Sequence, residues 1–185
     1  MMPEPRWPWC RSALALGLSL LLALPVGVSA KAPQRSAAER ELDQVQALLS
    51  VRLAGLPQDS GVQVLRDEGQ VTLRIPARLL FEFDAAGLRH DPAAELALTV
   101  SSQVLKKYHR LHADIVVFTD SIGGVDPNQT LSDQRAQALD AALKAEHIAA
   151  SRLQARGVGA AIMVAPNDTP EGRNQNRRVE IAFGR

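Results

Sequence analysis

Cysteine is almost absent from this chain of 185 residues, in which Cys10 is the only one. Because no cysteine follows residue 10, disulfides, thiolate catalysis and thiolate metal sites are excluded from the rest of the chain. Cys10 precedes the apolar run of residues 13–24, whereas a lipid-anchored bacterial protein carries its cysteine at the cleavage site. A lipid anchor on this residue is therefore not expected.

An excess of charge of one sign is also missing. Residues 1–30 hold only Arg6, Arg11 and Glu4 of the 21 basic and 20 acidic residues, so 19 of each sign remain after them. Aromatic residues make up 4% of the sequence. A neutral chain with few aromatics lacks the basic, stacking surface that binds nucleic acid, and no nucleic-acid partner is expected.

Motifs of catalytic and metal sites are scarce as well. His109 and His112 lie near Asp114 beside a predicted turn, where surface histidines are commoner than metal ligands or a general base. Gly157 and Gly159 form half of a dinucleotide-binding fingerprint, but the third glycine is missing. The sequence therefore predicts a protein that is not an enzyme, with no catalytic residue, no metal site and no cofactor.

Residues 1–30 have the pattern of a secretory signal peptide. Arg6 and Arg11 precede the uncharged run 13–24, and residues 28–30 (Val-Ser-Ala) offer a cleavage site of small residues. We expect cleavage after residue 30. The alternative is an anchor that is kept, although a proline and a glycine directly after the run would weaken the spanning helix.

Residues 31–60 predict a linker and an amphipathic helix. Helical periodicity over residues 38–54 gathers apolar side chains on one side. These side chains are Leu42, Val45, Leu48, Leu49 and Leu53. Three uses of the helix remain open: packing on the following domain, contact with a protein partner, or pairing with itself in a homodimer.

Residues 61–185 predict one α/β domain, a two-layer sandwich in which helices pack on a small mixed β-sheet. Alternation with period two predicts strands, and longer periodic segments predict helices. The expected elements are strands 62–65 and 71–75, a short apolar segment 79–84, helix 91–108, strand 115–118, helix 127–146, short helix 150–156, extended segment 161–165, loop 166–178 and strand 179–183.

The stretch 115–135 carries the polar groups that most favour a site. An apolar strand ends at Asp120, and a glycine-containing loop follows. Asp126 fits the N-cap of the next helix, Pro127 its first position and Gln129 the partner in a capping box. Because ligands of open α/β sheets bind outside the carboxyl ends of strands, Asp120 stands where a ligand is expected.

Arg135 lies on the helix side that should face the core, together with Leu131 and Leu139. A buried guanidinium needs an anionic partner, because removing one partner of a buried ion pair costs roughly 3–5 kcal/mol. Asp120 and the carboxylate of a ligand are both candidates, so a structural ion pair and a binding site remain open. The donor-rich residues 167–178 likewise allow a solvated loop or a binding surface.

Taken together, these residues resemble the OmpA-like C-terminal domain. The resemblance covers about residues 71–183 and rests on motifs that occur in the family's order and spacing. The motifs are Phe81-Glu82-Phe83-Asp84 with Leu88, Thr119-Asp120, Gly123, Asn128, Leu131-Ser132, Arg135-Ala136, Ser151-Arg152-Leu153, Ala155-Arg156-Gly157, Gly159, residues 167–173 and residues 176–181. The resemblance implies a periplasmic protein, associated with the outer membrane, that binds peptidoglycan non-covalently and links a partner or envelope component to the cell wall.

The family holds the diaminopimelate of the stem peptide, and the resemblance implies which residues do so here. Asp120 would hold the ammonium group and Arg135 would fork onto the carboxylate, the two contacting each other only in the empty site. For Arg178 the resemblance implies a structural role or a place on the rim of the binding site. Further residues at positions that line the family's pocket are Thr119, Asn128 and Asp84.

Two departures from the family pattern stand out. Val117-Phe118 replaces a common Gly-His before Thr-Asp, and Pro127 replaces a common tyrosine. Since the aspartate and arginine are kept, we expect binding to persist, and the sequence does not predict its strength or exact stem-peptide preference. The alternative function is a structural or assembly protein that uses this scaffold and the helix 38–54 to contact an envelope protein or a second copy.

Overall fold

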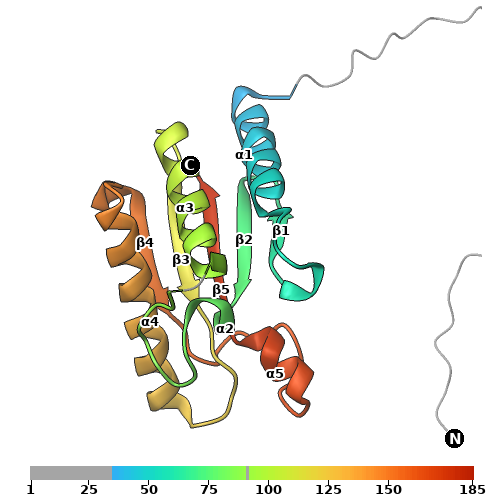
Figure 1. Cartoon of the computed structure of the whole chain (residues 1–185), viewed down its shortest axis with the longest axis vertical. Coiled ribbons are helices and arrows are strands. Elements are labelled where there is room, and N and C mark those ends of the chain that lie inside the picture. The colour runs from blue at the N-terminus through green and yellow to red at the C-terminus, as the bar shows by residue number, and fades with distance from the viewer. Residues whose placement is uncertain (1–34, 91) are drawn as a thin grey trace, which may run out of the picture. The chain divides into compact units, whose positions relative to one another are not determined.

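The computed structural model describes residues 35–90 and 92–185, so the predicted signal peptide lies outside the described residues. Residues 35–185 form one compact unit (Figure 1). No helix in these two described ranges is long and apolar enough to cross a bilayer. The elements in chain order are α1 (Ala37–Leu53), the 3-10 turn η1 (Gln58–Ser60), β1 (Gln63–Arg66), β2 (Gln70–Pro76), α2 (Ala77–Leu80), α3 (Pro92–Lys107), β3 (His112–Val117), α4 (Val125–Ala145), the 3-10 turn η2 (Ala150–Arg152), β4 (Leu153–Gly157), α5 (Pro170–Asn176) and β5 (Arg178–Gly184).

In the described part of the chain, the strands form a five-stranded sheet in the order β1-β2-β5-β3-β4. β5 lies in the centre and pairs antiparallel with β2 and β3, so that Ile181 lies between Leu73 and Ile115. β1 pairs antiparallel with β2. β3 and β4 run parallel, because α4 supplies the crossover that parallel strands require. The predicted small mixed sheet is therefore confirmed.

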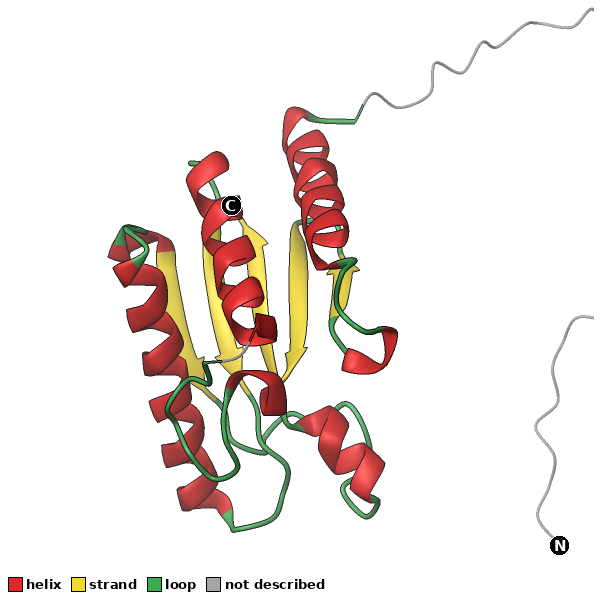
Figure 2. Cartoon of the chain, in the orientation of Figure 1, coloured by secondary structure: helices red, strands yellow, loops and turns green. Residues whose placement is uncertain are grey.

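Within the described residues, helices cover one face of this sheet. α1, α3 and α4 lie side by side over it (Figure 2), and α3 contacts both of the others. Leu73, Ile115 and Ile181 are fully buried under these helices, whereas the alternate residues Arg74 and Asp114 lie on the open face. Such alternation is expected of strands with one solvated face, and it confirms the predicted two-layer sandwich.

α1 belongs to this hydrophobic core. Its start is fixed by a capping box, in which the Ser36 hydroxyl accepts the N–H of Glu39 at 3.1 Å and the Glu39 carboxylate accepts the N–H of Ser36. The helix packs on β1, β2 and α3. The apolar side predicted for residues 38–54 is thus used within the domain. Its buried residues are Leu42, Val45, Leu49 and Leu53.

The short helix predicted for residues 150–156 is wrong. Only η2 forms, and residues 153–157 become β4, because pairing with β3 satisfies their backbone groups and buries Leu153. β4 then passes very close to α4. A Cβ on Gly157 would lie 2.3 Å from the backbone of Ser132 and Asp133, so this position requires a glycine.

The loop predicted for residues 166–178 is also wrong in part, because it contains α5. Thr169 caps this short helix by accepting the N–H of Gly172 at 3.1 Å, and Pro170 occupies its start. The extended segment predicted for 161–165 forms bends and no strand.

The short apolar segment predicted for residues 79–84 is divided between a helix and a loop. Ala77–Leu80 form α2, and Phe81 makes an isolated antiparallel bridge with Leu88. This bridge closes a loop of residues 82–87. This loop forms part of the cavity described below.

α4 begins earlier than predicted. Gly124, with φ of 92°, is the N-cap residue, and Val125 is the first helical residue. The predicted capping box does not form, because the Gln129 side chain donates to Asp133 and to the carbonyl of Gly157, each at 3.0 Å. Glycine adopts positive φ without strain, and this lets the chain turn directly into the helix.

Candidate binding cavity at the end of β3

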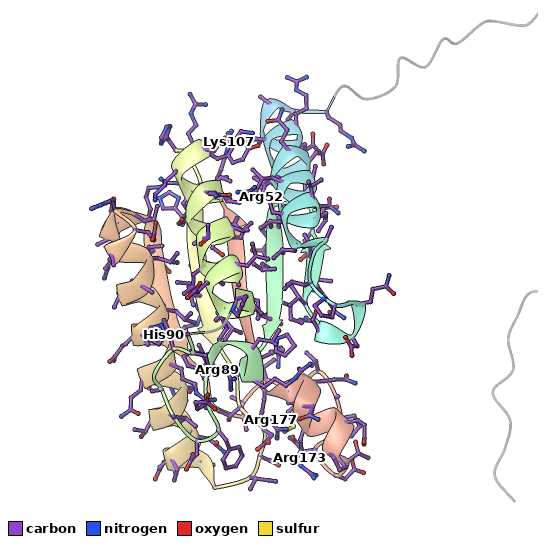
Figure 3. The ribbon with its side chains drawn as sticks, in the orientation of Figure 1. Arg52, Arg89, His90, Lys107, Arg173 and Arg177 are labelled. Atoms are coloured by element: carbon purple, nitrogen blue, oxygen red, sulfur yellow. The ribbon has the colours of Figure 1, made fainter. Side chains whose placement is uncertain are left out.

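A cavity of about 530 Å³ opens at the end of the sheet where β2 and β3 finish. Its walls come from α2 and the loop after it, the loop after β3, the first turns of α4, and Arg177. Arg89 and Arg177 reach this end from the loop before α3 and from the end of α5 (Figure 3). The position outside the carboxyl end of β3 agrees with the location predicted for a ligand.

Asp120 supplies a buried carboxylate at the cavity wall, with a residue exposure of 6%. Its Oδ1 accepts the N–H of Ile122 at 2.9 Å, and its Oδ2 accepts a hydrogen bond from Nη1 of Arg177. The contact with Arg135 predicted for the empty site is therefore wrong. Arg177 reaches the carboxylate instead, while other acceptors hold Arg135.

Arg135 supplies a buried guanidinium to the same cavity, with an exposure of 5%. Its Nε donates to the carbonyl of Ala85 at 2.7 Å, and its Nη2 donates to the carbonyl of Glu82 at 3.2 Å. The guanidinium also lies 5.0 Å from the centre of the Phe81 ring. Two of its three nitrogens are therefore fixed by the loop after α2, and Nη1 has no acceptor among the described residues.

The charge of Arg135 is incompletely balanced by the protein. Burial lowers the pKa of Arg135, the nearby carboxylate of Asp84 opposes this effect, and the positive charge of Arg177 adds to it. The side chain stays protonated at neutral pH, because arginine loses its proton only at very high pH. The arrangement therefore favours an anion in the cavity.

Thr119 and Asn128 hold the loop that carries Asp120. Nδ2 of Asn128 donates to the carbonyls of Asp120 and Ile122, at 3.1 and 2.8 Å. Thr119 donates from its hydroxyl to the Asp120 carbonyl at 3.0 Å and from its backbone N–H to Gly159 at 2.9 Å. Both side chains are buried, so they fix the shape of the loop.

Asp84 faces the cavity from the loop after α2. It is exposed and has a φ of 52°, a left-handed conformation that aspartate adopts more readily than most residues. The structure thus gathers the residues predicted for the site around one cavity, with the exception of Arg178. The gathered residues are Asp84, Thr119, Asp120, Asn128 and Arg135.

Residues 80–177 match the sequence model of the OmpA family. The chain belongs to the OmpA family. It is 37% identical over 142 residues to the probable lipoprotein YiaD of Escherichia coli (strain K12), and the match covers 77% of this chain and 62% of YiaD. It is 31% identical over 181 residues to the outer-membrane lipoprotein YfiB of Pseudomonas aeruginosa, covering 98% of this chain and 97% of YfiB. The solved cell wall anchor of the T6SS from Pseudomonas aeruginosa has a TM-score of 0.63 at 28% identity, covering 74% of this chain and 96% of that one.

In this OmpA-family chain, Arg178 lies away from the lining of the cavity. Its residue exposure is 2%, its Nε donates to Glu180 at 2.8 Å, and its guanidinium lies 3.6 Å from the centre of the Phe118 ring. Phe118 is one of the two departures from the family pattern noted in the sequence. The position of Arg178 fits the structural role that the resemblance implied.

Arg177 was missed by the sequence reasoning, although it lines the cavity and bonds Asp120. Two adjacent side chains near the start of a strand point to opposite sides. If Arg178 has a structural role on one side, Arg177 therefore points the other way, and the Arg177-Arg178 pair could have identified it as a candidate site residue. Phe83 and Ile122 were missed too. Both line the cavity, and they are 93% and 63% exposed.

The lining of the cavity carries charges of both signs. The side chains that line it include the carboxylates of Glu82, Asp84 and Asp120 and the guanidinium groups of Arg78, Arg89, Arg135 and Arg177. Among the residues that the structure describes, no cluster of His, Cys, Asp or Glu side chains could hold a metal ion. Paired opposite charges in one cavity suit a ligand that is itself zwitterionic.

Proposed function

We propose that this protein binds peptidoglycan non-covalently, and that its cavity receives the free end of diaminopimelate in the stem peptide. The observation that carries the proposal is the presence, in one cavity, of a buried carboxylate and a buried guanidinium that do not bond to each other, Asp120 and Arg135. The free end of diaminopimelate carries an ammonium and a carboxylate group. Membership of the OmpA family and likeness to a cell wall anchor support the same assignment.

Asp120 would accept the ammonium group. One carboxylate oxygen is already held by the N–H of Ile122, which fixes the orientation of the group. The other oxygen is bonded to Arg177, and the ammonium would take the place of that guanidinium. A ligand cation then replaces a protein cation on the same oxygen, so Asp120 keeps a positive partner in both states.

Arg135 would bind the carboxylate of the same ligand. Because Nε and Nη2 are held by carbonyl groups, the guanidinium plane is fixed before the ligand arrives and Nη1 supplies a donor. A guanidinium also bonds carboxylates with more directional geometry than an ammonium group does. The carboxylate of Asp84, whose charge acts on Arg135, also lines the cavity and would favour ligands that carry positive charge as well. Asn128 and Thr119 would position the Asp120 loop.

The far end of the domain suits attachment to another envelope component. Arg185 donates to Glu41 at 2.6 Å, which places the first turn of α1 beside the end of β5. β5 runs antiparallel to β3, so α1 begins at the end opposite the cavity (Figure 1). A periplasmic or outer-membrane-associated segment before Arg35 would thus leave the cavity free to face the cell wall. The assembly alternative is less supported, because the apolar side of the helix 38–54 packs within the domain.

Co-sedimentation with purified, diaminopimelate-containing peptidoglycan tests this function. We expect the protein to sediment with the wall and free diaminopimelate to release it. Asp120→Ala and Arg135→Ala should each weaken binding more than tenfold, because truncating one side of a buried charge pair costs about 2–5 kcal/mol.

Asp114→Ala and Arg156→Ala are matched controls, since both residues are exposed on strands away from the cavity lining. Circular dichroism should show the native fold in all four variants. Sedimentation of the Asp120 and Arg135 variants at the wild-type level would contradict the proposed function.

A further inference from the structure

Three of the exposed large apolar side chains lie at the cavity or directly beside its lining in the sequence. Phe83 and Ile122 line it, and Val125 begins α4 directly after the same loop as Ile122. We call Phe83, Ile122 and Val125 the apolar rim. The exposed large apolar residues of the described chain are Val51, Phe83, Ile122, Val125, Ile162, Met163 and Val164.

The apolar rim is not a part of the core. Phe83 is 93% exposed and Val125 is 83% exposed, whereas Phe81, two residues before Phe83, is 2% exposed and lies under Arg135. The cavity therefore has charged groups in its interior and apolar groups at its mouth. Binding sites commonly combine a few polar groups that fix orientation with apolar surface that the ligand covers.

We propose that the apolar rim is a second subsite, which binds the methyl group of the alanine that follows diaminopimelate in the stem peptide. This inference rests on the proposed function. With its ammonium on Asp120 and its carboxylate on Arg135, diaminopimelate directs the rest of the peptide out through the mouth, where Phe83 and Ile122 stand. Two residues are joined to diaminopimelate at that end, a glutamate with a polar carboxyl group and the alanine with its methyl group, and of these two side chains only the methyl group suits an apolar surface.

A methyl group fits this surface because it needs no hydrogen-bond partner. Burying one such group is worth about 0.8 kcal/mol, which corresponds to about fourfold in affinity. The rim would therefore distinguish stem peptides that retain this alanine from those that end at diaminopimelate.

Isothermal titration with two soluble stem peptides tests the inference. One is a tripeptide that ends in diaminopimelate, and the other is the tetrapeptide with one more alanine. We expect the wild-type protein to bind the tetrapeptide about fourfold more tightly. Phe83→Ser and Ile122→Ser should remove most of this difference, so that the ratio of the two affinities falls towards one. Both side chains are exposed, so these substitutions open no cavity in the core.

Val51→Ser is the control, because Val51 is 74% exposed on α1 and outside the cavity lining. Equal affinity of the wild type for both peptides would overturn the subsite, and so would a preference that survives in the Phe83 and Ile122 variants. An equal loss of affinity for both peptides in those variants would also overturn it, since the rim would then contribute to binding the diaminopimelate end that both peptides share. Failure of the wild type to bind either peptide would instead contradict the proposed function itself.

Discussion

Arg177 and Arg178 are neighbours in the sequence but lie in two different regions of the domain. Arg177 reaches into the cavity, where it bonds Asp120 and Asn174, and a third of its side chain is exposed. Arg178 lies against Phe118 at the end of the open sheet face, with 3% of its side chain exposed. One region presents charge to the cavity, and the other satisfies its charge internally.

The comparison with Arg135 shows that burial alone does not mark an arginine as structural. Burial lowers the pKa of both Arg135 and Arg178. For Arg178 this effect on the pKa is opposed by Glu180, a carboxylate to which it is directly bonded. Arg135 donates to backbone carbonyls instead, and only the nearby charge of Asp84 opposes the effect of its burial. The nature of the acceptors therefore separates the two, and an arginine held by neutral carbonyls still attracts an anion.

Removing the carboxylate that accepts from Arg178 should have the largest effect on stability. Glu180→Ala leaves the buried guanidinium without a carboxylate, and we expect the free energy of unfolding to fall by about 3 kcal/mol. Urea denaturation measures the change. Peptidoglycan binding by the folded fraction should stay at the wild-type level. A loss below about 1 kcal/mol, or a selective loss of binding, would break the distinction between the two regions.

Asn128→Ala should give an intermediate effect on stability and also weaken binding. Its amide bonds two backbone carbonyls in the loop that carries Asp120, and unpaired buried acceptors cost about 1–3 kcal/mol. We expect the free energy of unfolding, measured by urea denaturation, to fall by about 1–2 kcal/mol, and less of the protein to sediment with the wall. Gln137→Ala, on an exposed position of α4, is the control and should change neither. Wild-type binding by the Asn128 variant would show that the loop needs no such support.

Arg177→Ala should have the smallest effect. The pair with Asp120 is partly exposed, so we expect the free energy of unfolding to change by about 1 kcal/mol or less. Binding of diaminopimelate should change by less than fivefold, since the ammonium group takes the place of the lost guanidinium. Titration calorimetry measures this. A loss of affinity as large as that caused by Asp120→Ala would indicate that Arg177 binds the ligand carboxylate.

Much of the fold followed from the sequence where elements are long and periodic. The sheet core and the long helices were predicted because alternating and helical patterns run over many residues. β4 and α5 were not, because both are short and owe their form to pairing with β3 and to the cap at Thr169. The intrinsic helix or strand preference of a short segment does not reveal such contacts.

The candidate site, like the fold, was predicted only where its residues lie on long, regular elements. Asp120 and Arg135 sit at fixed places on a strand end and a helix, so their convergence on the cavity could be expected. Their partners could not, because Arg177 and the carbonyl of Ala85 come from segments distant in sequence. The mutual contact expected of Asp120 and Arg135 was wrong for this reason.

The most direct test of the two-charge site compares two stem tetrapeptides, with diaminopimelate or with lysine at the third position, by titration calorimetry. In the lysine peptide the α-groups of lysine lie in peptide bonds, so its side chain ends in an ammonium group without a carboxylate. That ammonium can engage Asp120 but leaves Arg135 without a partner. The account predicts one-site binding of the diaminopimelate peptide and binding of the lysine peptide at least tenfold weaker, a difference of about 1.4 kcal/mol or more. Equal binding of the two, or no binding of the diaminopimelate peptide, would contradict it.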